Sequence, residues 1–160
     1  MTAYTSTFST SFGPFSIAVS ENGSVLATAF GKLDSLRERF TAENLIDDSK
    51  RTRQAREQIS AYLAGKRTGF DLPLAPEGTA FQKRVWTALQ KIPRGEIRSY
   101  GNIAKSLRTA PRAVGRANAT NPICLIVPCH RVIGADGSLA GFAFGEDIKK
   151  RLLEHEGVSL

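Results

Sequence analysis

Cysteine and histidine are scarce in this 160-residue sequence, which contains two of each. Cys124 and Cys129 lie five positions apart in the segment NPICLIVPCHRVIG, residues 121–134. Two cysteines are too few for a disulfide framework. A zinc site from these cysteines, His130 and His155 would have the right number of ligands, but the spacing matches no common zinc module. We therefore expect free thiols and no metal.

Long hydrophobic runs are also missing. No apolar stretch approaches the roughly 20 residues that span a bilayer. The start, MTAYTSTFST, has neither the basic residues nor the apolar core of a secretion signal. We therefore expect a soluble, cytoplasmic protein with no membrane partner. A chain of this length can bury a real core as one compact unit or as two small domains.

Acidic residues are nearly absent from one part of the sequence. Between Lys83 and Arg131 there are ten basic residues and a single acid, Glu96. Residues 1–74 carry a net charge of +1 and residues 75–160 carry +6. A stretch of one sign suits a nucleic-acid backbone, because each neutralised phosphate releases counterions. The alternative is a solvated basic surface that only aids solubility, and charge alone does not decide between them.

The first half has the pattern of an α/β scaffold. The pattern predicts a β-hairpin at 15–30, helices at 33–40 and 49–65, and a short strand at 69–74. Asn22 and Gly23 can supply the positive φ angles of a tight hairpin turn. Gly65 is placed to end the second helix. No repeat and no cofactor motif occurs in this half.

The segment APEGT, residues 75–79, is rich in proline and glycine and is the expected joint of the chain. We therefore expect a domain at 1–74 and a second at 75–160. A helix start follows the joint at once, because Thr79 and Gln82 have the spacing of a capping box.

Residues beyond this joint have the pattern of a helix-turn-helix. Apolar residues recur at helical spacing up to Pro93, which makes Trp86 a core residue. Ser99 can cap a short helix, and Pro111 is suited to the first position of another, over residues 111–120. Two short helices with a tight turn between them are typical of a helix-turn-helix.

The second of these helices is unusual in composition. Its small residues are Ala113, Gly115, Ala117 and Ala119, and its long cationic ones are Arg112 and Arg116. A glycine inside a helix costs about 1 kcal/mol relative to alanine, so something should compensate. Close packing against another helix would do so. Close approach to a DNA groove, with arginines reaching phosphates or the base stack, is the other interpretation.

The run ICLIV, residues 123–127, predicts a buried strand that Pro128 ends. A thiol just beyond that end can face a cavity, and its basic neighbours His130 and Arg131 can shift it toward thiolate. Adjacent residues of a strand point to opposite faces, so His130 would act through an irregular turn or a bridging water. A purely structural role suits Cys124 better than Cys129. A Cys-His hydrolase would not explain the basic helix-turn-helix that precedes the cysteine.

The motif PCHRV, preceded by RAVGRANATNP and followed by LLEHEG, resembles the O6-alkylguanine-DNA alkyltransferases, or methylated-DNA-protein-cysteine methyltransferases. The resemblance covers the second half, and residues 78–104 look like the bacterial members in particular. It implies an α/β (α+β) fold: a small supporting α/β domain of ribonuclease H-like type, then a mainly helical, winged-helix-like domain with a helix-turn-helix. It also implies a monomer that repairs O6-alkylguanine in double-stranded DNA, without metal or cofactor, in a single turnover after base flipping.

The resemblance implies roles for five residues. Cys129 would accept the alkyl group irreversibly, His130 would act as base through a water, and Glu156 would hold the imidazole in its useful tautomer. Asn121 resembles the asparagine that ties the helix-turn-helix to the active-site strand. Tyr100 resembles the tyrosine that presses on the phosphate of the flipped nucleotide and offers its hydroxyl to guanine N3.

The resemblance also implies a DNA-facing helix. Arg112 would fill the gap that the flipped base leaves in the stack. Ala113, Gly115 and Arg116 would lie with it along the minor groove. The small residues at 113, 115 and 117 would let the helix lie close in that groove. A non-catalytic module that recognises the lesion and recruits other repair factors is the alternative, and the presence of Cys129 argues against it.

Val132, Phe142 and Cys124 would line the substrate pocket. Many relatives carry a tyrosine where this sequence has Phe142, so ring stacking should survive while a polar contact is lost. Cys124 is either inert packing or a second thiol near the site. The first half lacks cysteine and histidine, so the structural zinc of some relatives cannot be built here.

Overall fold

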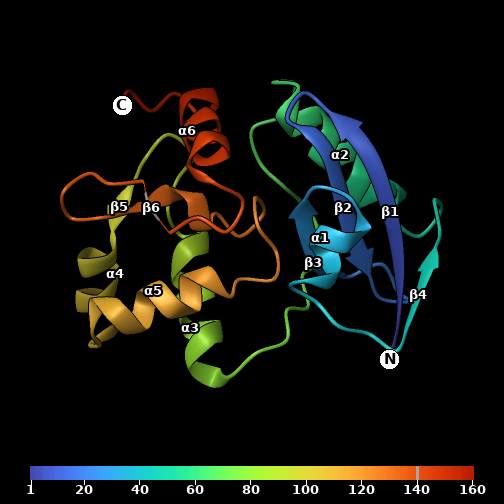
Figure 1. Cartoon of the computed structure of the whole chain (residues 1–160), viewed down its shortest axis with the longest axis horizontal. Helices are drawn as coiled ribbons and strands as arrows, with labels where there is room; N and C mark the ends of the chain where they lie inside the picture. Colours follow the sequence, from blue (N-terminus) through green and yellow to red (C-terminus); the bar gives the residue numbers. More distant parts are fainter. Residues whose placement is uncertain (140) are drawn as a thin grey trace. The chain divides into compact units, whose positions relative to one another are not determined.

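The structure, a computed structural model, describes residues 1–139 and 141–160 and divides into two compact units, residues 1–77 and 78–160 (Figure 1). The first unit contains β1 (Thr2–Thr10), β2 (Gly13–Val19), β3 (Val25–Phe30), α1 (Leu33–Arg37), β4 (Asn44–Asp47) and α2 (Arg53–Leu63). The second contains α3 (Ala80–Gln90), β5 (Arg98–Ser99), α4 (Tyr100–Leu107), α5 (Pro111–Ala119), the 3-10 turn η1 (Cys129–Arg131), β6 (Val132–Ile133) and α6 (Glu146–His155). The mixed α/β fold is confirmed. No helix among the described residues is long and apolar enough to cross a membrane.

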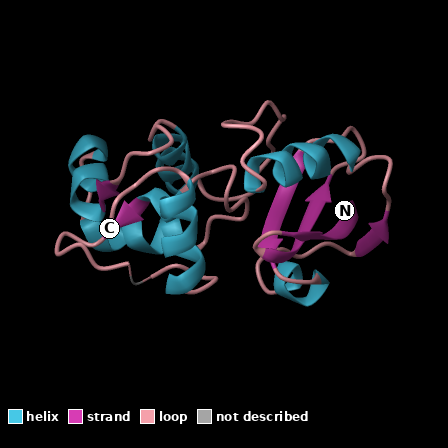
Figure 2. Cartoon of the chain, turned by 90° about the horizontal axis from the view of Figure 1, so that it is seen from above, coloured by secondary structure: helices cyan, strands magenta, loops and turns pink. Residues whose placement is uncertain are grey.

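The first unit is built on one four-stranded sheet in the order β3-β2-β1-β4. β2 pairs with β1 and β3 antiparallel, and β4 pairs with β1 in parallel. Figure 2 shows a short helix on one side of this sheet and a longer one on the other. Because helices cover both faces of the sheet, every residue of β3 is buried. The sequence did not predict β1 and β4, because β1 has only two large apolar side chains, Tyr4 and Phe8, and β4 is largely exposed.

The predicted hairpin forms, but its turn differs from the prediction. Ser20 N–H donates to the Ser24 carbonyl at 2.8 Å, and Gly23 N–H donates to the Ser20 carbonyl at 2.9 Å. Gly23 has a positive φ of 87°, whereas Asn22 does not have a positive φ. A longer loop with one glycine in the left-handed region therefore replaces the two-residue turn. The predicted strand at 69–74 is wrong: only Leu74 forms a single bridge, to Val25.

Gly65 ends α2 as predicted. It has a φ of 77°, and its N–H donates to the Tyr62 carbonyl at 3.1 Å. The next residue, Lys66, donates to the Ala61 carbonyl at 2.8 Å. This pair of bonds is a Schellman motif, in which a left-handed glycine lets the last carbonyls of a helix find partners.

The helix signals of the second unit are confirmed. Thr79 and Gln82 form a capping box at the start of α3, and Pro111 is at the first position of α5. Ser99 caps α4 through the N–H of Asn102. α4 and α5 pack side by side as the helix-turn-helix (Figure 1). Trp86 is only 2% exposed, which confirms its place in the core.

Candidate active site

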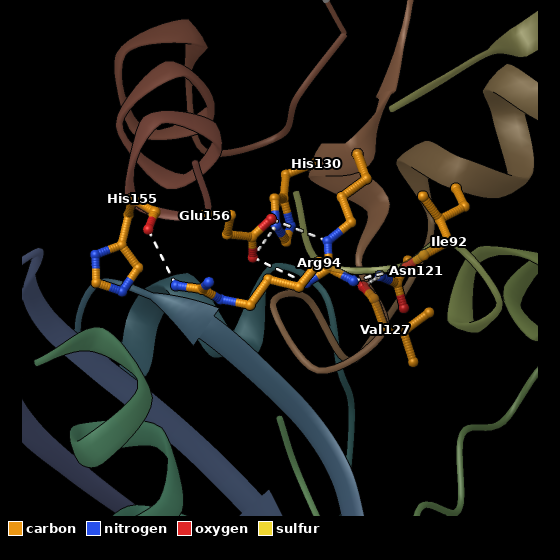
Figure 3. Close-up of polar contacts among 8 residues, drawn as sticks. Ile92, Arg94, Asn121, Val127, His130, His155 and Glu156 are labelled. Carbon is orange, nitrogen blue, oxygen red and sulfur yellow. Dashed lines mark hydrogen bonds and ion pairs between the residues drawn. The ribbon is translucent and has the colours of Figure 1, made fainter. Parts of the chain in front are cut away.

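The segment before Cys129 is a series of turns, so the prediction of a buried strand at 123–127 is wrong. Pro122 and Pro128 remove two backbone donors that a sheet ladder would use. The Asn121 side chain supplies the partners instead. Its Oδ1 accepts from Ile123 N–H at 3.0 Å, and its Nδ2 donates to the Val127 carbonyl at 2.9 Å. Figure 3 shows the contact between Asn121 and Val127.

The middle of this segment is a tight turn at Leu125, which has a positive φ of 72°. Ile126 N–H donates to the Cys124 carbonyl across it at 2.9 Å. A non-glycine residue in this region is strained and persists only where its surroundings fix it. The Cys124 side chain is fully buried here, as expected for a cysteine that acts as a small apolar residue.

Cys129 opens the 3-10 turn η1 and is only 5% exposed. Cys129 and His130 therefore follow an irregular turn of the backbone and not an alternating strand. Val132, the first residue of β6, pairs in parallel with Arg98 of β5. Because α4 begins directly after β5, this pairing brings Tyr100 to the same end of the unit as the cysteine.

Glu156 joins two consecutive buried side chains of η1. Its Oε2 lies 2.9 Å from His130 Nε2, the contact drawn in Figure 3. The same carboxylate accepts from Arg131 twice, at 2.9 Å from Nε and 3.0 Å from Nη2. Arg131 Nη1 also donates to the Ile92 carbonyl at 2.8 Å. A charged bidentate pair that is closed off from water resists rearrangement and fixes the orientation of the imidazole.

The end of α6 fixes the position of Glu156. Gly157 has a φ of 89°, and its N–H donates to the Glu154 carbonyl at 3.0 Å. Val158 N–H donates to the Leu153 carbonyl at 2.9 Å. These bonds form a second Schellman motif, so Glu156 is the C-cap residue, directly after the last residue of α6.

His130 is fully buried, and this burial lowers its pKa below 6.5 more than the hydrogen bond and charge of Glu156 raise it. The ring is therefore neutral at pH 7. The tautomer that donates Nε2–H to Glu156 carries its lone pair on Nδ1. Nδ1 is buried and has no hydrogen-bond partner among the described residues.

The lowered pKa of His130 predicts a loss of stability in weak acid. Below pH 6.5 the unfolded chain binds a proton at this position while the folded chain does not. The free energy of unfolding should fall by up to about 1.4 kcal/mol per pH unit until the folded pKa is reached. Above pH 6.5 both states are neutral, so this contribution vanishes.

Urea unfolding at a series of pH values measures the free energy of unfolding of the second unit. It is followed by the fluorescence of Trp86, the only tryptophan in the sequence. His130→Gln keeps an amide donor toward Glu156 but does not titrate, so its stability should depend less on pH. His155→Gln is the matched control. Identical pH slopes in the wild type and His130→Gln would contradict the prediction.

Lys149 is a fully buried amine of the site. Its Nζ donates to the Val132 carbonyl at 2.6 Å. Burial lowers the pKa of Lys149, and the charge of Cys129 opposes this shift. The interaction is mutual, so the ammonium group favours the thiolate form of Cys129.

Tyr100 is half-buried at the start of α4. Burial and then the charge of Cys129 raise the pKa of its hydroxyl, while a hydrogen bond from Asn118 lowers it. An ideal Cβ built on Gly141 would lie 3.2 Å from this hydroxyl. The chain next to Phe142 therefore passes directly by Tyr100.

Arg112 and Arg116 are exposed on α5, one helical turn apart. Gly115 and Ala113 are partly exposed beside them. A Cβ added to Gly115 would meet only Tyr100 Cδ1, at 4.0 Å. This is an ordinary contact, so packing inside the unit does not require the glycine.

Two residues lie elsewhere than expected. Ala117 is buried, and its carbonyl accepts from Trp86 Nε1 at 2.8 Å, so its small size serves the packing of α5 on α3 and no DNA contact. Arg131 is bound to Glu156 in the interior and cannot belong to a phosphate-binding surface.

The expected pocket residues Val132 and Phe142 are both buried, and the Phe142 ring packs against Phe144 with centroids 5.6 Å apart. Within the described part of the chain, no three histidine, cysteine or acidic side chains are grouped to hold a metal ion. The set Cys124, Cys129, His130 and His155 therefore forms no such cluster.

Sequence reasoning did not find two residues of the site, Asn118 and Lys149, and it did not find the partner of a third, Arg131. The signal for Lys149 is its place three and four residues before Leu152 and Leu153, on the buried stripe of α6. Arg131 was expected as a basic neighbour of the Cys129 thiol and as part of the basic stretch, whereas the structure pairs it with Glu156. Nothing in the composition of α5 distinguishes Asn118.

Both units of the chain match models of known protein families. Residues 3–76 match the family model described as the 6-O-methylguanine DNA methyltransferase ribonuclease-like domain, and residues 80–158 match the DNA binding domain of the same protein. The methylated-DNA–protein-cysteine methyltransferase of Methanosarcina barkeri is 49% identical over 149 residues, covering 90% of each chain. That of Methanosarcina acetivorans is 55% identical over 117 residues, covering 72% of this chain and 75% of the relative.

Solved structures agree with these matches. The crystal structure of Mycobacterium tuberculosis OGT in complex with DNA has a TM-score of 0.85 at 41% identity, covering 96% of this chain and 92% of that one. The O6-methylguanine-DNA methyltransferase of Pyrococcus kodakaraensis has a TM-score of 0.68 at 28% identity, covering 98% and 99%. This chain therefore belongs to the 6-O-methylguanine DNA methyltransferase family.

Proposed function

We propose that this protein repairs O6-alkylguanine in double-stranded DNA by irreversible transfer of the alkyl group to Cys129. The observation that carries this proposal is the buried contact between Glu156 and His130, the residue that directly follows Cys129 in the chain. A carboxylate that fixes a neutral imidazole next to a thiol is the arrangement of an activated nucleophile.

The proposed reaction balances within the site. The Cys129 proton passes to His130 Nδ1 through a water, and the thiolate attacks the alkyl carbon. The S–C bond forms as the C–O6 bond breaks, and the electron pair stays with the guanine. Tyr100 gives its proton to guanine N3 and later recovers the one taken from the thiol. The thioether is permanent, so each protein molecule acts once.

Access to the lesion requires base flipping, because O6 lies within the paired stack and Cys129 is almost buried. We propose that α5 lies in the minor groove and that Arg112 fills the gap in the stack. Exposed cations of the second unit would bind phosphates whatever the sequence: Lys83, Arg84, Lys91, Lys105, Arg108, Arg112 and Arg116.

We assign the chemistry to a DNA-binding, alkyl-acceptor domain at 75–160 and a supporting role to residues 1–74. All residues of the proposed site come from one chain, so we propose a monomer. A protein whose activity depends on one free thiol needs a reducing compartment to keep that thiol from oxidation. This favours the cytoplasm.

Mass spectrometry tests the proposed function. After incubation with a duplex that carries O6-methylguanine, the protein should gain about 14 Da, the mass that a methyl group adds when it replaces the thiol proton. Cys129→Ala should show no gain, and Cys124→Ala is the matched control that should keep it. An unchanged wild-type mass would refute the proposal, and a gain that persists in Cys129→Ala would refute the choice of residue.

Arg112→Ala should separate DNA binding from chemistry. We expect repair in duplex DNA to slow by about 10- to 100-fold, since the gap in the stack would stay open and the flipped base could return. The reaction with free O6-benzylguanine, which needs no flipping, should change little. Rates on the two substrates measure the difference, and equal losses on both would contradict the role of Arg112.

Gly115→Ala should stabilise the protein and weaken repair. The added methyl group improves helix propensity by about 1 kcal/mol and meets no close neighbour in the unit. On the DNA side it would hold α5 away from the groove. Urea unfolding and the duplex repair rate give the two readouts. A stabilised variant with wild-type repair would mean that the groove does not need the glycine.

A further inference from the structure

Two buried hydrogen-bond acceptors beside Cys129 have no partner among the described residues. One is His130 Nδ1, which the proposed function uses as the base. The other is Oδ1 of Asn118, a residue of α5 that is only 3% exposed. A buried acceptor without a donor costs folding free energy, so a native site that keeps one calls for an explanation.

A contact with the backbone of Cys129 determines which end of the Asn118 amide is the oxygen. Nδ2 donates to the Cys129 carbonyl at 3.3 Å. A carbonyl oxygen can only accept, so the amino group must face it. Oδ1 therefore cannot exchange places with the amino group, and the atom without a partner is an acceptor that needs a donor.

Asn118 lies at the depth that a substrate of Cys129 has to reach. Cys129 is itself only 5% exposed, so a base that meets its sulfur enters the interior of the unit. Gly115 is one helical turn before Asn118 on α5, and a Cβ added there would lie 4.0 Å from the Tyr100 ring. A Cβ added to Gly141 would lie 3.2 Å from the Tyr100 hydroxyl. Asn118 is thus close to the residues between which we place the flipped base.

The chemistry of the lesion identifies a donor for Oδ1. Alkylation at O6 removes the hydrogen from N1, so the ring nitrogens N1, N3 and N7 of an O6-alkylguanine nucleotide are all acceptors. The exocyclic 2-amino group carries the only N–H bonds of this base. Enzymes that extrude a base read it through hydrogen bonds to its edge. Of the groups on the lesion, only the 2-amino group can satisfy Asn118 Oδ1.

We propose that Asn118 Oδ1 accepts a hydrogen bond from the 2-amino group of the flipped O6-alkylguanine and so identifies the base as guanine. This inference rests on the proposed function and adds a recognition residue to it. The same amide joins the base to the backbone of the nucleophile, because its amino group binds the Cys129 carbonyl. A purine without the 2-amino group leaves Oδ1 unpaired, which is the situation in which a buried polar site discriminates most strongly.

The test removes the substrate partner first. Transfer to Cys129 is measured with free O6-benzylguanine and with 6-benzyloxypurine, the same molecule without the 2-amino group. Free bases need no flipping, so differences in base pairing do not enter the rates. The wild type should react about 10- to 100-fold faster with O6-benzylguanine, because the analogue leaves a buried acceptor without a donor.

Asn118→Leu then removes the protein partner and keeps the volume of the side chain. The readout is the ratio of the two rates, because loss of the contact with the Cys129 carbonyl slows both reactions alike. We expect this ratio to fall about tenfold, the coupling between the amide and the 2-amino group. Thr120→Val is the matched control, since it replaces an exposed polar residue directly after α5 and should keep the wild-type ratio.

Equal rates of the wild type with both substrates would overturn the inference. So would an unchanged ratio in Asn118→Leu, or a ratio that falls as far in Thr120→Val. Asn118→Ala takes the place of the leucine variant if that variant does not fold. The proposed function fails separately, since it fails only if the wild-type protein gains no mass from O6-methylguanine in DNA.

Discussion

Replacing Glu156 by alanine is expected to lower the free energy of unfolding of the second unit by about 3 to 5 kcal/mol. The carboxylate is fully buried and binds His130 once and Arg131 twice. Its removal leaves the Arg131 charge in the interior with only the Ile92 carbonyl among these partners. An unpaired buried charge is among the few defects that cost this much.

Urea unfolding followed by Trp86 fluorescence measures the loss. Glu154→Ala is the matched control, because Glu154 is exposed near the end of the same helix and should change stability by less than about 0.5 kcal/mol. Glu156→Gln keeps an acceptor without the charge and should fall between the two, which gives a measurable variant if Glu156→Ala does not fold. Similar losses for Glu154→Ala and Glu156→Ala would show that the buried pair contributes little.

Lys149→Met should slow alkyl transfer at neutral pH by about 10- to 100-fold, because the thiolate form of Cys129 loses a neighbouring positive charge. The methionine keeps the length and the apolar stem but removes the charge that interacts with Cys129. It also removes the hydrogen bond to the Val132 carbonyl. Because the loss concerns the thiolate fraction, raising the pH should restore most of the rate.

The transfer rate to free O6-benzylguanine as a function of pH isolates this effect, since it does not depend on DNA binding. Lys150→Met is the matched control, because Lys150 is the exposed neighbour of Lys149 on α6. If Lys149→Met stays slow at high pH, the amine acts by supporting the Val132 backbone and not by its charge.

Local signals in the sequence were sufficient for most of the helices. The capping box at Thr79, the proline at 111 and the glycine at 65 each act through neighbouring backbone groups, so their meaning does not depend on the rest of the fold. Strands depend on partners that are distant in the sequence. β1 was missed for this reason, since it has few large apolar residues and is held as a strand by its pairing with β2 and β4.

The segment 123–127 shows the opposite error. Its apolar, β-branched residues predict a strand, yet the Asn121 side chain and two prolines turn it into a series of tight turns. Propensity describes the backbone in isolation, whereas here a single amide takes over the backbone hydrogen bonds. The same turns explain why Cys129 and His130 do not alternate as they would on a strand.

The sequence by itself determined the nucleophile and its neighbours in the chain, because Cys129, His130 and the helix-turn-helix before them are close in sequence. It also determined the family, through motifs that are contiguous. Only the tertiary structure decided which charges serve the chemistry. Arg131 and Lys149 look like surface cations in the sequence, and folding buries both against groups that lie 17 to 39 residues away. Burial changes the energy of a charge far more than its neighbours in the chain do, and burial is a property of the packed molecule.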